Sequence, residues 1–382
     1  MMSALLQSSR RALAVAAQRG SQVRTEMTRA VVLEEKNVLR LRDIDVDEPF
    51  TADDVRIDIH SVGICGSDVH YYELKQPMIL GHEASGLVTQ VGENVTHLKV
   101  GDRVCMEPGV PLPNSPSVLR GQYNLCRGLR FWATPPPAYA TNLTNDPSWG
   151  AGHGCLRASV VHPGAFTFKL PDNVSLDWGA MVEPLAVGVH SCTKAHIRPG
   201  DVAVVSGAGP IGMLTTMAAL ASGASHVYVI DLNPRKCQVA ESLVPGCVTG
   251  VHIGAVDPVQ AILEATNGRG ADVIFECAGN HKSAQLTTKY AANGARIMLI
   301  GCPPTNPVLD VGDMQVKELS VQGVFRYANV YPQAIALLGS GKIPLDSIIT
   351  DHFNFDDSVK AFDYMVKPDD HTIKSVIHVK SE

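Results

Sequence analysis

The chain has 382 residues, of which 45% are hydrophobic and 18% are charged, and its formal net charge is -6 at pH 7. This length and composition predict a globular protein with two domains, because a single hydrophobic core rarely grows so large. The negative charge argues against nucleic acid or an acidic membrane as the main partner. The 9 cysteines stand apart without a CxxC pair, which indicates a reducing compartment rather than a disulfide framework.

Residues 1–29 differ in composition from the rest of the chain. They contain five arginines and one acid, Glu26, which gives a charge of +4, together with Ser, Ala and Leu. This composition is typical of a mitochondrial targeting segment, and the apolar run ALAVAA is too short for a secretory signal. The alternative is a basic tail without an address in a cytoplasmic protein. We leave these residues out of the predicted fold.

The first half of the chain reads as a β-rich domain. Short alternating strands are predicted in residues 29–46, 53–65, 84–95 and 101–109, separated by Gly, Asp and Asn turns and without helical periodicity. The C-terminal segment, residues 347–379, has a strand–helix–strand pattern, and we expect it to rejoin this first domain. No internal repeat is found.

The stretch CGSDVHYYELKQPMILGHEASG concentrates metal-ligand chemistry. Cys65 is expected at the end of a strand, with a turn at Gly66, and His82 and Glu83 follow 17 and 18 residues later. A third segment, MVEPLAVGVH, offers Glu183. Thiolate, imidazole and carboxylate groups around one open position suit a catalytic zinc. The alternative is a solvated loop, since a His–Glu pair alone is usually that.

The second half carries a dinucleotide-binding pattern. A β-branched run at residues 202–205 precedes a helical stretch at 213–221, and between them lies the turn Gly207-Ala208-Gly209-Pro210-Ile211-Gly212. A second strand then ends at Asp231. Glycines in this context let the backbone approach a pyrophosphate at a helix N-terminus. A glycine-rich turn without a ligand is the alternative.

Asp231 bears on the choice of nucleotide. An acid at the end of the second strand accepts hydrogen bonds from the ribose 2′- and 3′-hydroxyls and repels a 2′-phosphate, which favours NAD over NADP. Arg235 lies near enough to keep NADP open.

Strand–helix alternation continues beyond Asp231 and predicts a doubly wound parallel sheet for residues 191–325. The run from Val202 to Ile230 lacks charged residues if His226 is neutral, so a membrane span is conceivable. Its five glycines and prolines, however, favour a buried parallel strand followed by a packed helix.

The chain contains the motifs GHEASGLVTQVGENV, CGSDVH, GDRV, EPLAVGVH, GAGPIG and GVFRY. With these motifs, the segment from about Thr28 to Val379 resembles the zinc-containing medium-chain dehydrogenases/reductases. The polyol branch, which includes sorbitol, xylitol and arabinitol dehydrogenases, is the most similar. The resemblance implies an α/β plus β fold: a GroES-like catalytic domain at 30–190, an inserted Rossmann domain at 191–325 and a C-terminal return at 326–382. It also implies zinc, NAD, oxidation of a sugar alcohol to a ketose, and a dimer or tetramer. A threonine-type or simple alcohol dehydrogenase is the alternative within the enzyme class, but GVFRY favours polyols.

The resemblance also implies roles for individual residues. Cys65, His82, Glu83 and Glu183 match the metal-binding residues of the family, Glu183 reaching the ion directly or through its water. Asp68 matches the acid that orients His82. The remaining matches are a proton relay, Ser67 and His70; residues near the substrate and metal water, Arg326 and Tyr327; and the pocket lining, Tyr71 and Phe131. Ordinary packing is an equal alternative for Tyr71 and Phe131.

Three segments depart from the family pattern. Many relatives bind a second, structural zinc through four cysteines, but residues 107–126 keep only Cys126, so we expect one zinc per subunit. Only Leu74, Lys75 and Gln76 connect HYYE to PMILGHE, where the polyol branch has a longer segment. If this shortening disrupts the site, the chain is a nucleotide-binding protein without catalysis. Residues 135–157 read as a long exposed loop.

Overall fold

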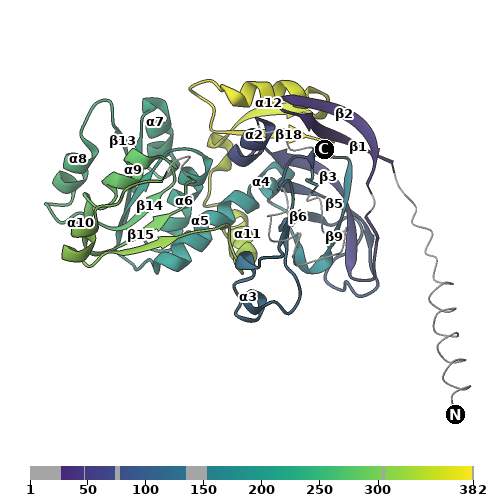
Figure 1. The fold of residues 1–382 in the computed structure, drawn as a ribbon, viewed down its shortest axis with the longest axis horizontal. Coiled ribbons are helices and arrows are strands. Elements are labelled where there is room, and N and C mark those ends of the chain that lie inside the picture. The colour runs from purple at the N-terminus through teal and green to yellow at the C-terminus, as the bar shows by residue number, and fades with distance from the viewer. Residues whose placement is uncertain (1–26, 47, 74–77, 135–152, 303–305, 381–382) are drawn as a thin grey trace, which may run out of the picture.

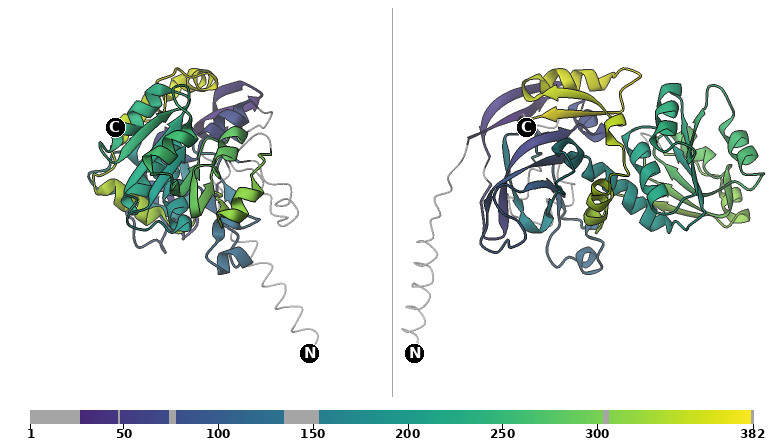
Figure 2. Two further views of the ribbon diagram at one scale, coloured as in Figure 1. Left: turned by 90° about the vertical axis from the view of Figure 1, so that its left-hand side faces the viewer. Right: turned by 180° about the vertical axis from the view of Figure 1, so that it is seen from behind.

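The computed structural model describes residues 27–46, 48–73, 78–134, 153–302 and 306–380. They form two lobes that lie side by side along the long axis of the molecule, as Figure 1 shows and the rear view of Figure 2 repeats. One lobe is built mainly from antiparallel strands and the other from a parallel sheet flanked by helices.

The β-rich lobe contains most of the first half of the chain and its C-terminal end. Its strands are β1 (Met27–Glu35), β2 (Val38–Asp45), β3 (Asp54–Gly63), β4 (Met78–Ile79), β5 (Glu83–Val91), β6 (Arg103–Met106), β7 (Gly109–Val110), β8 (Arg130–Phe131), β9 (Ser159–Pro163), β10 (Thr167–Lys169), β17 (Ile349–Asn354) and β18 (Lys374–His378). Its short helices and 3₁₀ turns are α2 (Gly66–Tyr72), α3 (Pro116–Leu119), η1 (Tyr123–Leu125), η3 (Gly164–Phe166), α4 (Leu176–Ala180), η4 (Leu345–Ser347), η5 (Phe355–Asp357) and α12 (Ser358–Val366).

The main sheet of this lobe has the order β10-β6-β5-β3-β18-β17, with β9 also paired to β3. Smaller sheets are formed by β2-β1-β4 and by β7-β8. The antiparallel pairing of β18 with β3 sets Val376 opposite Gly63, so the end of the chain lies in the sheet of the first half. The C-terminal strand–helix–strand pattern is thus present as β17, α12 and β18. The domain limits at residues 190 and 325 stay predictions, and Met27, Thr28 and Arg29 already belong to β1.

The second lobe has six parallel strands in the order β13-β12-β11-β14-β15-β16. This is the doubly wound Rossmann order, in which the chain starts at the centre and builds outward on both sides. The predicted fold class is therefore confirmed. Its elements are β11 (Val202–Ser206), α6 (Pro210–Ala221), β12 (His226–Asp231), α7 (Pro234–Leu243), β13 (Val248–His252), α8 (Pro258–Ala265), β14 (Ala271–Glu276), α9 (His281–Leu286), β15 (Ala291–Leu299), α10 (Val311–Val316) and β16 (Ser320–Gly323).

Two helices lie where the lobes meet, α5 (Val182–Ala195) and α11 (Tyr331–Gly339), as seen in Figure 1. Helix α5 contacts β5 of one lobe and β15 of the other. One hydrophobic cluster runs through this junction and includes Leu185 of α5, Val205 of the parallel sheet and Val376 of β18. The start of α5, which carries Glu183, is therefore held rigidly between the two lobes.

The uncharged run from Val202 to Ile230 forms β11, α6 and most of β12. In the described part of the chain, no helix combines the length and the apolar character that crossing a bilayer requires.

The expectation of an exposed loop is wrong for residues 154–157. Cys155 and Arg157 are buried, and Cys155 N–H donates to the Gly81 carbonyl at 2.9 Å. Arg157 pairs with Glu48 and donates through Nε to the Gly154 carbonyl. The backbone of residues 154–156 forms hydrogen bonds with residues 79–81. Amino-acid composition alone does not distinguish such a buried segment from an exposed loop. Residues 135–152, the rest of the predicted loop, lie outside the described residues.

Candidate metal centre and cofactor site

Cys65 lies two residues beyond β3 and is the N-cap of α2. A turn was predicted at Gly66, and in the structure Gly66 is the first residue of this short helix. The reason is Asp68 at the third helical position, whose carboxylate accepts the Cys65 N–H at 3.0 Å. Such a bond satisfies a backbone N–H at the start of a helix. The helix therefore holds the Cys65 backbone in place at the strand end.

Asp68 connects the Cys65 segment to the GHE segment. It is fully buried, accepts the Gly81 N–H at 3.1 Å and lies 3.4 Å from Nδ1 of His82. Burial disfavours its ionisation, but His82 and the two backbone N–H groups keep the pKa of Asp68 below its usual value. A carboxylate beside the second ring nitrogen is the arrangement that orients metal-binding histidines. The role of Asp68 in orienting His82 stays a prediction, and the 3.4 Å contact supports it.

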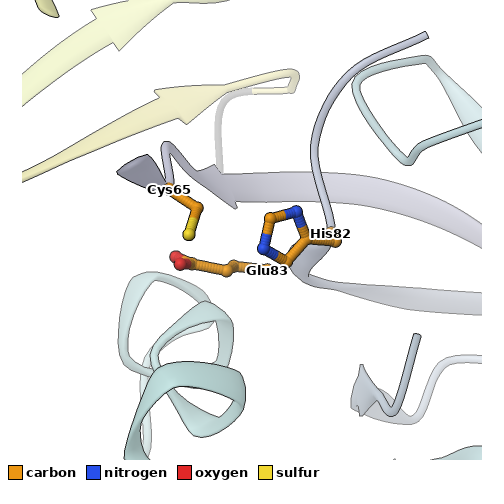
Figure 3. A group of neighbouring side chains, drawn as sticks. All are labelled: Cys65, His82 and Glu83. Atoms are coloured by element: carbon orange, nitrogen blue, oxygen red, sulfur yellow. The ribbon is translucent and has the colours of Figure 1, made fainter. Parts of the chain in front are cut away.

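Cys65, His82 and Glu83 converge on one point. One ligand atom from each lies within 4.8 Å of the others, and Figure 3 shows the thiol and the carboxylate directed toward each other beside the imidazole. His82 and Glu83 are buried, while Cys65 is half-buried. A thiol, an imidazole and a carboxylate are the donors of an open zinc site. The donor set therefore fits a zinc ion. Cys65, before the short connection at residues 74–76, and His82 and Glu83, after it, come together in spite of that shortening.

Glu83 has a buried cation beside it that the sequence interpretation missed. Lys374 of β18 forms an ion pair with Glu83 and donates to the Ile64 carbonyl at 2.9 Å. Burial opposes the charge of Lys374, but Glu83 and Cys65 outweigh it and raise the pKa of Lys374. A side chain at Gly63 would collide with Glu83 and Lys374, so this glycine makes room for the pair. In the sequence, the sign of this buried cation was a single lysine in the otherwise largely apolar strand KSVIH.

Glu183 is buried in the first turn of α5 and accepts a hydrogen bond from the Tyr327 hydroxyl at 2.7 Å. Burial raises the pKa of Glu183 to about 6, although His82 and the Tyr327 hydroxyl act in the opposite direction. Its carboxylate interacts electrostatically with Glu83 but is not in the group of atoms within 4.8 Å. Glu183 therefore lies near Cys65, His82 and Glu83 but is not one of the residues whose ligand atoms converge.

Phe131 and Arg326 stack beside His82. The Phe131 ring centroid is 5.6 Å from that of His82, and the Arg326 guanidinium lies 3.6 Å from the Phe131 centroid. Arg326 has a positive φ of 54°, which is uncommon for a residue with a side chain. The Phe131 ring thus lies between Arg326 and His82 in a chain of contacts. Phe131 thus lies at the predicted site.

The other predicted site residues that lie on α2 differ in their exposure. Ser67 and His70 are exposed and three positions apart, so they share one face of the helix. Tyr71 is half-buried and packs against the core of the β-rich lobe. For Tyr71 the packing alternative agrees with its contacts, while the exposed pair has the access to water that a proton relay requires.

A second buried acid, Glu107, was not singled out from the sequence. Burial raises the pKa of Glu107 to about 7, although a hydrogen bond with Tyr123 acts in the opposite direction, and Glu183 raises it further. Nearby, the Tyr331 hydroxyl donates to the Met106 carbonyl at 3.0 Å, and the rings of Tyr327 and Tyr331 are 5.4 Å apart. In the sequence, the sign of this buried acid was a glutamate in the segment MEPG, directly after a buried strand.

The glycine-rich turn in the second lobe has the geometry of a phosphate site. Gly207 has a φ of 102°, and a Cβ on Gly212 would collide with the Gly207 carbonyl. Gly209 is the N-cap of α6, and Pro210 and Ile211 begin that helix. A Cβ on Gly209 would meet no atom of the described residues within 4 Å. The space beside the N-terminus of α6 fits a pyrophosphate, which helix N-termini bind.

Asp231 lies directly beside this turn at the end of β12. Its carboxylate accepts the Ala208 N–H at 2.7 Å and the Asn233 N–H at 2.8 Å. Arg235 is exposed in the first turn of α7. The acid and the glycine turn thus form one continuous edge of the parallel sheet, as a ribose with its pyrophosphate requires.

Comparisons with known proteins agree with this geometry. Residues 51–172 match the alcohol dehydrogenase GroES-like domain, and residues 210–340 match the zinc-binding dehydrogenase family. The chain is 45% identical to the D-xylulose reductase of Morganella morganii, over 89% of this chain and 98% of that protein. It is 36% identical to human sorbitol dehydrogenase, over 86% and 90% of the two chains. An Escherichia coli oxidoreductase/dehydrogenase of unknown specificity superposes with a TM-score of 0.85 at 32% identity, covering 93% and 100%.

The fold and site therefore define a dehydrogenase with a GroES-like domain and a Rossmann domain, as predicted. The chain belongs to the zinc-binding medium-chain dehydrogenases, in the polyol branch of D-xylulose reductase and sorbitol dehydrogenase.

Proposed function

We propose that this enzyme oxidises a secondary hydroxyl of a sugar alcohol of the xylitol, sorbitol or arabinitol type to a ketose, with one catalytic zinc per subunit. The observation that carries the proposal is the convergence of Cys65, His82 and Glu83 within 4.8 Å. The names of the D-xylulose reductase and sorbitol dehydrogenase relatives support the substrate class.

Zinc, when bound, supplies a Lewis acid for the alcohol oxygen, and the nicotinamide supplies the hydride acceptor. The protein's part is to hold and orient. Cys65, His82 and Glu83 are the proposed ligands, with Asp68 fixing the His82 ring and Lys374 neutralising the remaining charge of Glu83.

The alcohol proton must reach solvent when the hydroxyl is oxidised. We assign this to Ser67 and His70, which are exposed and adjacent on α2. Glu183 and Tyr327 form a hydrogen-bonded pair beside the metal centre and are proposed to position the substrate and its water. Arg326 and Phe131 are proposed to form the substrate wall next to His82.

We propose NAD as the nucleotide. The charge of Asp231 beside the glycine turn supports this, because a carboxylate there repels a 2′-phosphate. Arg235, exposed in the next helix, keeps NADP as the alternative.

Other expectations remain predictions. Leu74–Pro77 lie outside the described residues, so a catalytically impaired nucleotide-binding protein stays the alternative from a different class. A dimer or tetramer rests on family resemblance alone. Residues 1–26 also lie outside the described residues, and the bacterial relatives give the mitochondrial address no support.

The test combines a substrate panel with a ligand variant. Xylitol, sorbitol, arabinitol, threonine and ethanol are assayed with NAD and with NADP, and we expect turnover with a polyol and NAD. Cys65→Ser should lose zinc and turnover while binding of NADH, followed by fluorescence, persists. Cys247→Ser, at a half-buried cysteine far from the centre in sequence, is the control and should keep both. Full activity of Cys65→Ser would remove Cys65 from the ligands, and turnover of threonine or ethanol alone would overturn the substrate class.

A further inference from the structure

A second group of metal-binding side chains lies apart from the catalytic residues. Among the described residues, Asp177, His352 and His378 each offer one ligand atom, and these atoms lie within 4.8 Å of one another. They come from three elements, the first turn of α4 and the neighbouring strands β17 and β18. None of them is a residue of the proposed catalytic centre.

The distances between the ligand atoms of this group are close to the distances between ligand atoms around a bound metal ion. His378 Nε2 lies 3.0 Å from both oxygens of the Asp177 carboxylate. His352 Nδ1 lies 3.6 Å from Asp177 Oδ2. Around a tetrahedral zinc with bonds of about 2.1 Å, neighbouring ligand atoms are about 3.4 Å apart. Small side-chain rotations would therefore suffice to receive an ion.

The positions of the three side chains are set by the fold. Strands β17 and β18 run parallel, with His352 opposite Val376 and Asn354 opposite His378, so both histidines project from the same face. Their rings are 5.2 Å apart. Ser61 of β3 donates to Asp177 Oδ1 at 2.5 Å, which holds the carboxylate. The group is thus assembled by packing between the sheet and α4.

Solvent reaches this group. The side chains of Asp177, His378 and His352 are 24%, 33% and 48% exposed. A cavity of about 150 Å³ adjoins two of the three, and its lining residues are Ser175, Asp177, Trp178, Asp346, Ile349 and His352. An ion bound here could complete its coordination with water, and could exchange with the medium.

We propose that Asp177, His352 and His378 bind a divalent transition-metal ion of the zinc class, in addition to the catalytic ion. Two imidazoles and a carboxylate are suitable zinc ligands. Binding at Nε2 of His378 uses the neutral tautomer that carries its proton on Nδ1, so the ion takes the place of the hydrogen bond between His378 and Asp177. The ion joins α4 to the two C-terminal strands, so its effect is on stability, with no step in catalysis.

The experiment is a calorimetric titration of Zn²⁺ into the zinc-loaded enzyme as isolated, with metal content measured before and after. We expect one further ion per chain and a rise in the melting temperature with added Zn²⁺, because a ligand that binds only the folded state stabilises it. His352→Gln should weaken this uptake by about tenfold or more and abolish the thermal shift. Because His352 is half exposed, this variant should fold normally.

Two controls separate this site from others. His371→Gln removes a comparably exposed histidine, 40% exposed and 3.5 Å from Asp351, and should leave the uptake unchanged. Cys65→Ser should lose the catalytic ion but retain the added one, so failure of the proposed function is distinguishable. The proposal is overturned if the wild-type chain takes up no further ion, or if His352→Gln takes it up as strongly as wild type.

Discussion

Lys374 and Glu83 form an ion pair with side chains only 2% and 1% exposed, directly beside Cys65 and His82. The contact joins β18 to the start of β5, so the last strand of the chain supplies a charge to the centre formed by the first half. Lys374 contacts Oε2 of Glu83, and one carboxylate oxygen of Glu83 is among the converging ligand atoms. A buried carboxylate here therefore has two possible sources of compensation, the lysine and the ion.

Lys374→Met should strongly destabilise the zinc-free protein. Removing one partner of a buried pair leaves an uncompensated charge, at a cost of about 3–5 kcal/mol. The loss should be smaller in the zinc-loaded protein, because the ion also neutralises Glu83. Chemical unfolding with and without zinc measures both. Lys360→Met, which breaks an exposed pair with Asp357, is the control and should change little. Equal effects of the two substitutions would contradict the role of burial.

Tyr327→Phe should shift the acid limb of the rate–pH profile upward. The Tyr327 hydroxyl donates to Glu183 and lowers the pKa of a carboxyl that burial raises to about 6. Without this bond the pKa of Glu183 rises, by about one pH unit for a hydrogen bond to a charged group. If ionised Glu183 is required, activity at pH 6 falls more than activity at pH 8. The measurement is kcat/KM between pH 5.5 and 9.

Tyr331→Phe is the matched control for this prediction. Its hydroxyl donates to the Met106 carbonyl instead of to a carboxylate, and its ring is 5.4 Å from that of Tyr327. The acid limb should therefore stay in place. An unshifted limb in Tyr327→Phe would mean that Glu183 titration does not govern the rate.

Patterns local in sequence were predictable, and contacts distant in sequence were not. The glycine turn, the helix after it and Asp231 lie within 25 residues and were recognisable together. Cys65, His82 and Glu83 were recognisable because of their residue types and spacing. Lys374 was not, since only the pairing of β18 with β3 brings it to Glu83.

Burial of polar residues was the other source of error. Arg157 was predicted to lie in an exposed loop, and Glu107, near the end of a predicted strand, was not singled out, yet both are buried with partners. Helix α2 is short, and its start depends on the Asp68 carboxylate rather than on apolar periodicity. In each case a single tertiary contact decides the local structure.

His162 should make the protein acid-sensitive. It lies fully buried on β9, its Nε2 contacts the Glu107 carbonyl at 2.9 Å, and Nδ1 has no hydrogen-bond partner within the described part of the chain. Burial, with Arg130 and Arg157 adding repulsion, lowers the pKa of His162 to about 3. At pH 7.5 the imidazole is neutral in both states. As the pH falls below about 6.5, only the unfolded chain gains the proton, so stability is lost progressively down to about pH 3.

Between pH 7.5 and 5.5 this histidine should cost about 1.4 kcal/mol of unfolding free energy. His162→Gln keeps an amide donor for the Glu107 carbonyl but cannot titrate. Its stability should therefore fall less than that of wild type over the same range, measured by chemical unfolding at the two pH values. The opposite contribution of Glu107, whose raised pKa removes stability as the pH rises toward 7, is present in both proteins and cancels. Parallel pH profiles of the two proteins would show that His162 is already protonated in the folded state or reaches solvent.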